Sequence, residues 1–209
     1  RKQEKCYVLE GSVFVAGAAV QWLRDGLKII TTSEESGKRA AMLSSSEGVY
    51  VVPSFTGLGA PYWNADARGA MFNLTRGTTQ EHIIRATVES LAYQTYDVID
   101  AMRKDSHLAI SSLRVDGGAS RNDFLLQFQA DLLQCEVKRS FISETTALGA
   151  AYLAGLAIGY WHDKEEIKTL HRDGRCFLAS ADDEKRKMRL AGWHRAIQGV
   201  CTFSQKEDI

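Results

Sequence analysis

The segment 113–128 combines an acidic side chain with two glycines between a predicted strand and a predicted helix. The apolar run before Asp116 predicts a buried strand, and the run that follows predicts a helix. Gly117 and Gly118 allow a sharp turn and a close approach by another molecule, because neither has a Cβ atom. The amides at the start of the helix point outward at the positive end of its dipole. The segment therefore indicates a nucleotide-binding site, although an ordinary strand-to-helix turn explains the same residues equally well.

Other kinds of reactive site find little support in the sequence. The segment contains neither G-x-G-x-x-G nor G-x-x-x-x-G-K-[ST], so the common dinucleotide and P-loop motifs are excluded. Asp116 has the chemistry to bind magnesium or to act as a base. The histidines and cysteines show no zinc-ligand spacing and no Ser-His-Asp or Cys-His grouping, so we expect no metal held by this chain. The four cysteines lack a C-x-x-C pair and predict reduced, buried thiols.

Composition limits the class of protein. The 209 residues suffice for one large domain, and 26 basic residues balance 26 acidic ones. Without a long basic run, nucleic acid is not an expected partner. No apolar run has the length of a membrane span, and no signal peptide is visible, so we expect a cytoplasmic protein without a membrane partner. Because the chain opens without Met and enters structure at once, we expect residue 1 to be internal to a longer protein.

Periodicity predicts an α/β domain with a mixed sheet flanked by helices, since strands come first and then alternate with helices. The expected strands are residues 6–9, 49–53, 70–74, 113–115 and 136–139, and the expected helices are residues 18–27, 31–43, 80–104, 122–133, 146–158 and 182–203.

Seven runs of the sequence form a recognisable pattern: Leu9–Asp25, Phe55–Trp63, Ala67–Ala70, Arg76–Gly77, His82–Thr87, Val115–Ala119 and Thr145–Gly155. These runs resemble the FGGY carbohydrate kinases, and among them the glycerol kinases. They cover nearly the whole chain in family order and thin out after Trp161. The loop sequence Gly57-Leu-Gly-Ala-Pro-Tyr-Trp63 favours the glycerol kinases over relatives that act on xylulose, gluconate or ribulose. Asn73 departs from the family pattern, which has glycine there, but Asn tolerates left-handed backbone better than most residues.

The resemblance implies an actin-like ATPase (ribonuclease H-like) domain over residues 1–209, equivalent to the C-terminal, nucleotide-side domain of a two-domain kinase. It also implies four nucleotide-binding residues: Gly17, Gln21, Gly118 and Asn122. Gly118 would offer bare backbone, and the Asn122 amide would bond the base or ribose. The plainer alternatives are that Gly118 is only a turn glycine, that Asn122 is only a helix cap and that Gln21 is only a surface residue.

The resemblance also bears on neighbouring residues. Asp116 is expected to support the turn rather than to bind a metal. Thr145, Thr146 and Gly149 resemble a segment that lines the adenosine pocket, but a helix start capped by Thr explains them at least as well. Tyr62 and Trp63 could stack on a sugar, although packing against another domain or subunit is the favoured reading.

The implied reaction is the ATP-dependent phosphorylation of glycerol to glycerol 3-phosphate. The family's phosphate-binding hairpin, catalytic base and glycerol-binding residues have no counterpart here, so we expect no catalytic residue in this chain and no activity from it alone. Magnesium would be held mainly through the phosphates and the absent N-terminal domain. The expected partners are ATP, glycerol, that N-terminal domain and further copies in a homo-oligomer. The alternatives are another FGGY sugar kinase, xylulokinase- or gluconokinase-like, or a non-catalytic actin-like binding module.

Overall fold

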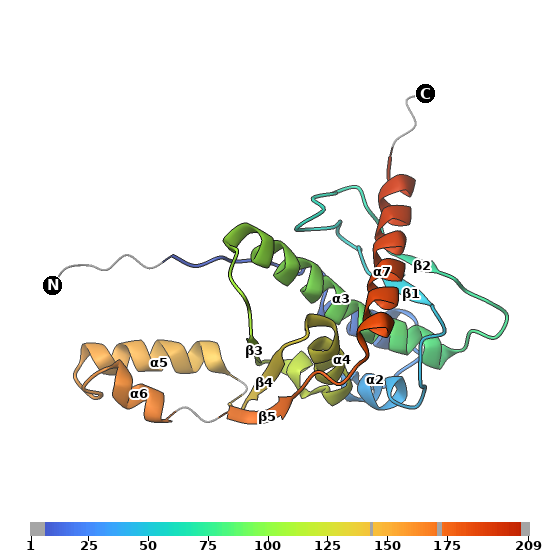
Figure 1. Cartoon of the computed structure of the whole chain (residues 1–209). Helices are drawn as coiled ribbons and strands as arrows, with labels where there is room; N and C mark the ends of the chain where they lie inside the picture. The colour runs from blue at the N-terminus through green and yellow to red at the C-terminus, as the bar shows by residue number, and fades with distance from the viewer. Residues whose placement is uncertain (1–6, 143, 171–172, 206–209) are drawn as a thin grey trace.

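The computed structural model describes residues 7–142, 144–170 and 173–205. Figure 1 shows a main body crossed by two long helices and, to one side, a pair of helices that extends away from it. The helical segments are α1 Gly17–Gln21, the π-helix Trp22–Gly26, α2 Ser33–Ala40, α3 Gln80–Ser106, the 3₁₀ turn Gly118–Arg121, α4 Asp123–Leu133, α5 Thr145–Ala157, α6 Lys164–Leu170 and α7 Asp183–Phe203. The strands are β1 Tyr50–Val52, β2 Ala70–Phe72, β3 Ser112–Val115, β4 Glu136–Ser140 and β5 Asp173–Phe177.

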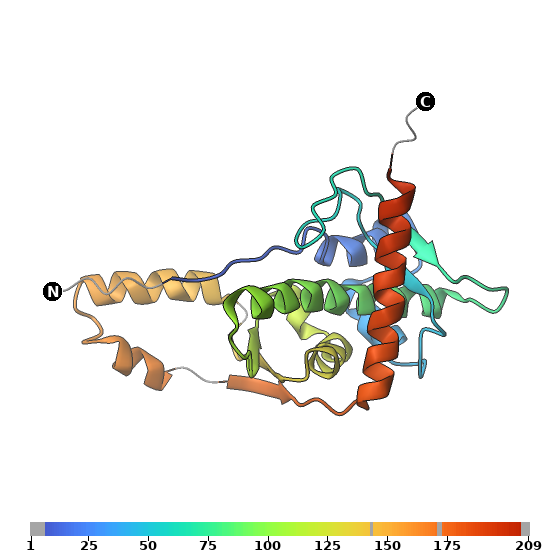
Figure 2. The ribbon, with the colours of Figure 1, turned by 45° about the horizontal axis from the view of Figure 1, so that its top comes forward.

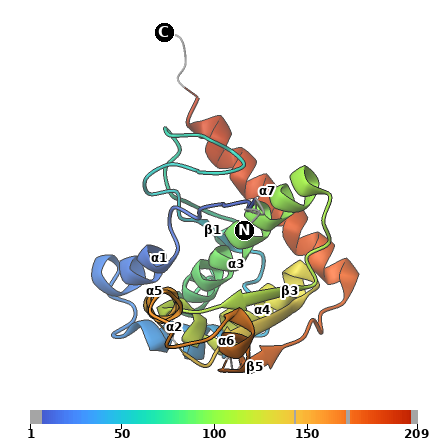
Figure 3. The same ribbon diagram turned by 90° about the vertical axis from the view of Figure 1, so that its left-hand side faces the viewer.

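Helix α3 is the centre of the fold. It begins where the backbone N–H of Thr79 donates to His82 Nδ1 at 3.1 Å, and it ends at His107 in the left-handed conformation (φ 55°). In Figure 3, α3 runs through the middle of the body, and it packs against α1, α2, α4 and β1. Its buried face therefore contributes to most of the main core, which includes Ile84, Val88 and Leu91.

The strands form two sheets. β1 and β2 make an antiparallel pair. β3, β4 and β5 make a second sheet in that order, with β3 parallel and β5 antiparallel to β4. Helix α4 lies between this sheet and α3, because Leu125 and Phe128 belong to the main core whereas Leu126 and Ala130 pack with the sheet. The predicted mixed α/β architecture is confirmed, although the strands divide between two sheets.

Helix α7 closes the core from the far end of the sequence. Asp182 caps it by accepting from the Lys185 N–H at 3.3 Å. Trp193 is fully buried and stacks on Tyr93 of α3, with ring centroids 5.1 Å apart. Tyr50 of β1 donates to the Arg189 carbonyl at 3.1 Å, so the helix is held to both α3 and β1.

The structure differs from the local predictions at several places. The expected helix 18–27 is α1 followed by a π-helix. The expected strand 6–9 is wrong for residues 7–9, which form no regular element, and Cys6 lies outside the described residues. α6 and β5 were not predicted. Of the described cysteines, Cys135 is buried as expected, but Cys176 is exposed and Cys201 is only partly buried.

Asn73 has the left-handed backbone that its place in the glycine pattern requires (φ 61°). Its amide also donates to the Gly48 carbonyl at 3.2 Å, which ties the end of β2 to the turn before β1. The prediction that asparagine preserves this turn is confirmed. Within the part of the chain that the structure describes, no helix is long and apolar enough to cross a membrane.

Candidate nucleotide site

Gly118 and Asn122 lie where β3 meets α4. Gly117, with φ 78°, turns the chain into the 3₁₀ segment that begins at Gly118. Gly118 is exposed, and a Cβ atom built on it would meet no other atom within 4 Å. Asn122 Oδ1 accepts from the Leu125 N–H at 3.1 Å, so the side chain caps α4. The helix cap that was the alternative prediction for Asn122 is therefore present. The Asn122 amide nitrogen makes no hydrogen bond to another described residue.

Gly17 and Gln21 lie one turn apart at the start and end of α1. Both are exposed, and a Cβ atom built on Gly17 would also meet nothing within 4 Å. The buried residues of this helix, Ala19 and Val20, fix its other side in the main core. Gly17 therefore offers open space beside its backbone, as Gly118 does.

Helix α2 packs against both α1 and α4 and so connects the two pairs of residues. Its Gly37 contacts Asn122 directly: a Cβ atom at position 37 would lie 2.5 Å from Asn122 Oδ1. Any larger residue there requires the Asn122 side chain to move. Sequence reasoning missed Gly37, because a lone glycine in a short polar helix carries no signal of such a contact.

Asp116 lies at the end of β3 and accepts a hydrogen bond from Thr145 Oγ1 at the start of α5. This contact joins the β3 turn to α5 and agrees with a supporting role for Asp116. Thr145 and Gly149 line a cavity of about 380 Å³ together with Tyr152, Phe141 and other residues of α5, β4 and α6. Thr146 is exposed and does not line it.

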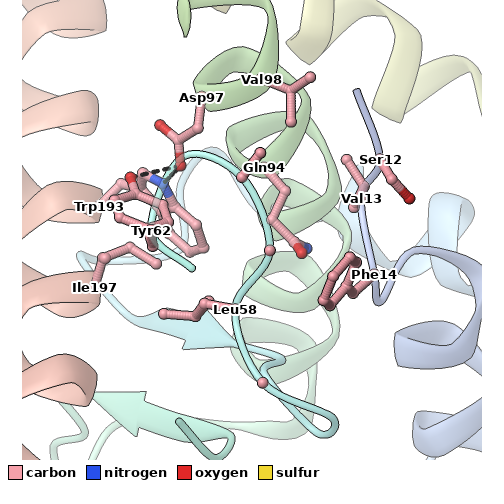
Figure 4. A pocket seen from close by; sticks show the side chains of 13 residues that line it. Ser12, Val13, Phe14, Leu58, Tyr62, Gln94, Asp97, Val98, Trp193 and Ile197 are labelled. Atoms are coloured by element: carbon pink, nitrogen blue, oxygen red, sulfur yellow. Dashed lines mark hydrogen bonds between the residues drawn. The ribbon is translucent and has the colours of Figure 1, made fainter. Parts of the chain in front are cut away.

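Tyr62 does not form an exposed stacking platform. Its hydroxyl donates to Asp97 Oδ2 at 2.9 Å, and burial raises the pKa of the tyrosine well above its ordinary value. Asp97 is buried on α3 and also accepts from Trp193 Nε1 at 2.7 Å (Figure 4). Trp63, in contrast, is 74% exposed. None of the four predicted nucleotide-binding residues lines the small cavity beside this cluster, which has a volume of about 20 Å³. None of them lines the cavity of about 380 Å³ beside α5 either.

His194 is also bonded to Asp97, with Nε2 and Oδ1 3.2 Å apart, and this bond raises the pKa of the imidazole above 6.5. A raised histidine pKa stabilises the fold fully below pH 6.5, and the contribution is lost as pH rises through the folded-state pKa. We expect His194→Gln to remove this dependence, which chemical unfolding at pH 6 and pH 9 would measure. The loss between the two pH values should be below about 1 kcal/mol, because the side chain is half exposed. An unchanged pH dependence in the variant would contradict the assignment.

The protein-family model described as "FGGY family of carbohydrate kinases, C-terminal domain" matches residues 1–158 of this sequence. The chain belongs to the FGGY family of carbohydrate kinases. Among curated FGGY relatives, a glycerol kinase of Geobacillus kaustophilus is 56% identical over 197 residues, which is 94% of this chain and 40% of the relative. A Streptococcus pyogenes glycerol kinase is 54% identical over 97% of this chain and 40% of its own length. The chain thus spans about 40% of the length of the curated relatives that it matches.

Solved structures of FGGY kinases have the same fold. A Plasmodium falciparum glycerol kinase with ADP superposes with a TM-score of 0.82 at 34% identity, over 88% of this chain and 37% of that one. A Rhodospirillum rubrum xylulose kinase superposes with a TM-score of 0.74 at 22% identity, over 91% and 39% of the two chains. The predicted actin-like ATPase fold is confirmed by these neighbours.

Proposed function

We propose that this chain is the C-terminal, nucleotide-side domain of a kinase that transfers phosphate from ATP to glycerol. The observation that carries the proposal is its 54–57% identity to glycerol kinases over nearly its whole length. A xylulose- or gluconate-specific kinase is less well supported, because those neighbours are only 22% identical. The proposal also places the kinase in the cytoplasm and makes it a homo-oligomer.

The residues proposed to hold the nucleotide are Gly17, Gln21, Gly118 and Asn122. Open space beside both glycines would let a ligand lie against the backbone. The Asn122 amide would donate to the base or ribose while its oxygen keeps capping α4. Gln21 is exposed and one helical turn from Gly17, so its amide would reach the same ligand. This chain's part in the reaction is then to bind and orient the nucleotide.

Magnesium does not fit the described residues as a site of their own. Among them, no three His, Cys, Asp or Glu side chains are grouped to hold a metal ion. In the proposal, magnesium is bound by the phosphates and by the part of the kinase outside this chain, which also supplies the catalytic base. We therefore expect no glycerol-dependent ADP release from the chain alone, and a coupled assay that detected such turnover would contradict this assignment.

The nucleotide site can be tested in a chimeric enzyme, in which the part of the G. kaustophilus glycerol kinase preceding its match is joined upstream of this chain. We expect Gly118→Val or Gly17→Val to weaken binding of a non-hydrolysable ATP analogue at least about tenfold, or ~1.4 kcal/mol. The valine side chain would fill the space that the ligand needs. Neither glycine has a left-handed backbone or a close neighbour, so the substitutions should leave the fold intact. Isothermal titration calorimetry measures the change.

Gly77→Val is the matched control, because Gly77 is exposed in the loop between β2 and α3, and a Cβ atom there makes only an ordinary contact, 3.7 Å from Thr75 Oγ1. Binding should be unchanged in this variant. Equal affinities in all three variants would refute the site. ATP-dependent phosphorylation of glycerol by the chimera, compared with xylulose and gluconate, separately tests the function.

A further inference from the structure

Asp123, the first residue of α4, is held by two arginines of the neighbouring sheet. Arg139 Nη1 on β4 donates to Asp123 Oδ1 at 2.7 Å, and Arg175 Nη1 on β5 donates to Oδ2 of the same carboxylate. Both guanidinium groups lie over the ring of the buried Phe177, at 5.8 Å and 5.0 Å from its centroid. Asp123, Arg139 and Arg175 together form a clamp, in which one carboxylate neutralises two like charges and joins α4 to two strands.

The clamp anchors the chain on both sides of Asn122. Besides bonding to Asp123, Arg139 Nη1 donates to the carbonyl of Ser120 at 3.2 Å. Asn122 therefore lies between two residues that the same guanidinium group holds. Gly118 begins the 3₁₀ turn to which Ser120 belongs. The clamp thus acts on the segment that carries both the open backbone of Gly118 and the amide of Asn122.

The sheet is irregular where the clamp is made. The register between β4 and β5 shifts between Lys138 and Ser140, so Arg139 lies within the irregularity. Gly174 of β5 approaches the chain closely here, because a Cβ atom built on it would be 2.8 Å from the Arg139 carbonyl oxygen. Such irregularities set where a side chain of the strand is aimed. β5 therefore supports Arg139 through its backbone as well as through Arg175.

β5 lies outside the part of the chain that matches the family model, which ends at residue 158. Figure 2 shows the chain running from β5 through a short loop into α7. Asp131 of α4 holds this loop, because its Oδ1 accepts from the backbone N–H groups of Ser180 at 2.8 Å and Ala181 at 3.2 Å. β5 is thus fixed to α4 both at Arg175 and just after its own end, so the segment after the matched domain has a defined connection to the start of α4.

We propose that the clamp of Asp123, Arg139 and Arg175 positions Asn122 and Gly118 for the nucleotide, so that β5 contributes to nucleotide binding without touching the ligand. This inference rests on the proposed function, because Asn122 and Gly118 are two of the four proposed nucleotide-binding residues. A ligand that contacts both needs them at one spacing, and a site held in that geometry beforehand binds more tightly. The three clamp residues are positioning residues.

The chimeric enzyme tests the clamp. We expect Asp123→Ala and Arg175→Met each to weaken binding of the non-hydrolysable ATP analogue at least about threefold, because the segment 118–123 loses an anchor. Isothermal titration calorimetry measures the change. Both side chains are largely exposed, at 47% and 59%, so the substitutions should leave the fold intact.

Asp183 and Lys187 provide matched controls on α7. Asp183 is likewise the first residue of its helix and pairs with two cations, but both of them, Arg186 and Lys187, lie on that same helix. Asp183 is 53% exposed, close to Asp123, and Lys187 is 59% exposed, as Arg175 is. Asp183→Ala and Lys187→Met should leave the affinity for the analogue unchanged. Equal affinities in the clamp variants and the control variants would overturn the proposal.

Two further measurements separate positioning from a general weakening of the fold. The double variant of Asp123→Ala and Arg175→Met should bind the analogue as Asp123→Ala alone does, because both substitutions break the same contact. Each single variant should raise the KM for ATP and leave the KM for glycerol unchanged. Additive losses of affinity, or a KM for glycerol that rises in parallel, would overturn the proposal.

Hydrogen–deuterium exchange in the chimera supplies a readout that needs no substrate. The backbone amides of Ser120 and Asn122 donate to carbonyls three residues earlier, at 3.2 and 3.1 Å. In Asp123→Ala these amides should exchange at least about threefold faster than in Asp183→Ala, because the turn is less firmly held. The same exchange rates in the two variants would contradict a positioning role.

The two proposals can fail separately. Nucleotide affinity that depends on the clamp, in a chimera that does not phosphorylate glycerol, would leave the clamp standing and refute the function. Glycerol phosphorylation by a chimera whose nucleotide affinity ignores the clamp substitutions would do the reverse.

Discussion

Replacing Arg85 with methionine is expected to lower the free energy of unfolding by about 3–5 kcal/mol, because it leaves a buried carboxylate without its partner. Arg85 Nε donates to Glu89 Oε1 at 2.7 Å, and both side chains are at least 94% buried. The guanidinium also donates to the carbonyls of Ala40 at 2.9 Å and of Leu43, which holds the end of α2 against α3. Urea unfolding followed by circular dichroism measures the loss.

The pH dependence of this loss has a definite sign. Burial raises the pKa of Glu89 above 4.5, and Arg85 opposes that rise. The stability contributed by protonated Glu89 is present below pH 4.5 and is lost as pH rises through the folded-state pKa. Without Arg85 the folded-state pKa rises further, so the loss in Arg85→Met should be largest near neutral pH and smaller near pH 4.5.

Two variants serve as controls for Arg85→Met. Lys104→Met removes an ion pair of the same i,i+4 spacing on the same helix, but Lys104 is 75% exposed, so the cost should stay below about 0.5 kcal/mol. Arg85→Met combined with Glu89→Met should recover much of the stability, because no buried charge remains. If the free energy of unfolding of Arg85→Met were no lower than that of Lys104→Met, the prediction would be contradicted.

Replacing Asp97 with alanine is expected to lower the free energy of unfolding by about 3 kcal/mol, because a buried indole N–H and a half-buried hydroxyl lose their acceptor. The indole N–H of Trp193 and the hydroxyl of Tyr62 both donate to Asp97 Oδ2, at 2.7 and 2.9 Å. The carboxylate thus connects α3, α7 and the loop between β1 and β2 (Figure 4). Thermal unfolding followed by near-ultraviolet circular dichroism, which is sensitive to Trp193, measures the effect.

Asp100→Ala provides the comparison for Asp97, since Asp100 lies one turn further along α3 and pairs with the exposed Lys104. This variant should lose less than about 0.5 kcal/mol. Asp97→Asn, which keeps one acceptor oxygen, should fall between the two alanine variants. If Asp97→Ala and Asp100→Ala were equally stable, the buried cluster would have no energetic role.

The long periodic elements were predictable from the sequence, and the short polar ones were not. α3, α4 and α7 carry regular apolar spacing and clear caps, and their boundaries agree with prediction to within two residues. α6 has only two apolar residues in Lys-Glu-Glu-Ile-Lys-Thr-Leu, and β5 reads Asp-Gly-Arg-Cys-Phe, which lacks β-branched alternation. β5 forms because Val137 and Phe177 pack together across the sheet, a contact between distant residues that local propensity does not contain.

The candidate site was predictable in its turns but not in its contacts. The double glycine after β3 indicated the turn at Gly117 and the open backbone at Gly118, and both are present. Gly37, which touches Asn122 from α2, gave no signal, because a contact across 85 positions is a property of packing. Asp97 and Trp193 are 96 residues apart and meet for the same reason. The roles of Gly17, Gln21, Gly118 and Asn122 in binding remain predictions.

The placement of Trp193 in α7 sets the order in which a nascent chain can fold. The indole fills the centre of a core built mostly by residues before position 133, so that core stays open while the ribosome synthesises the intervening segment. Contacts such as Tyr50 to Arg189, 139 positions apart, form only after α7 has left the exit tunnel. Folding of this core is therefore expected to be slow, with exposed apolar surface available to chaperones until α7 has been synthesised.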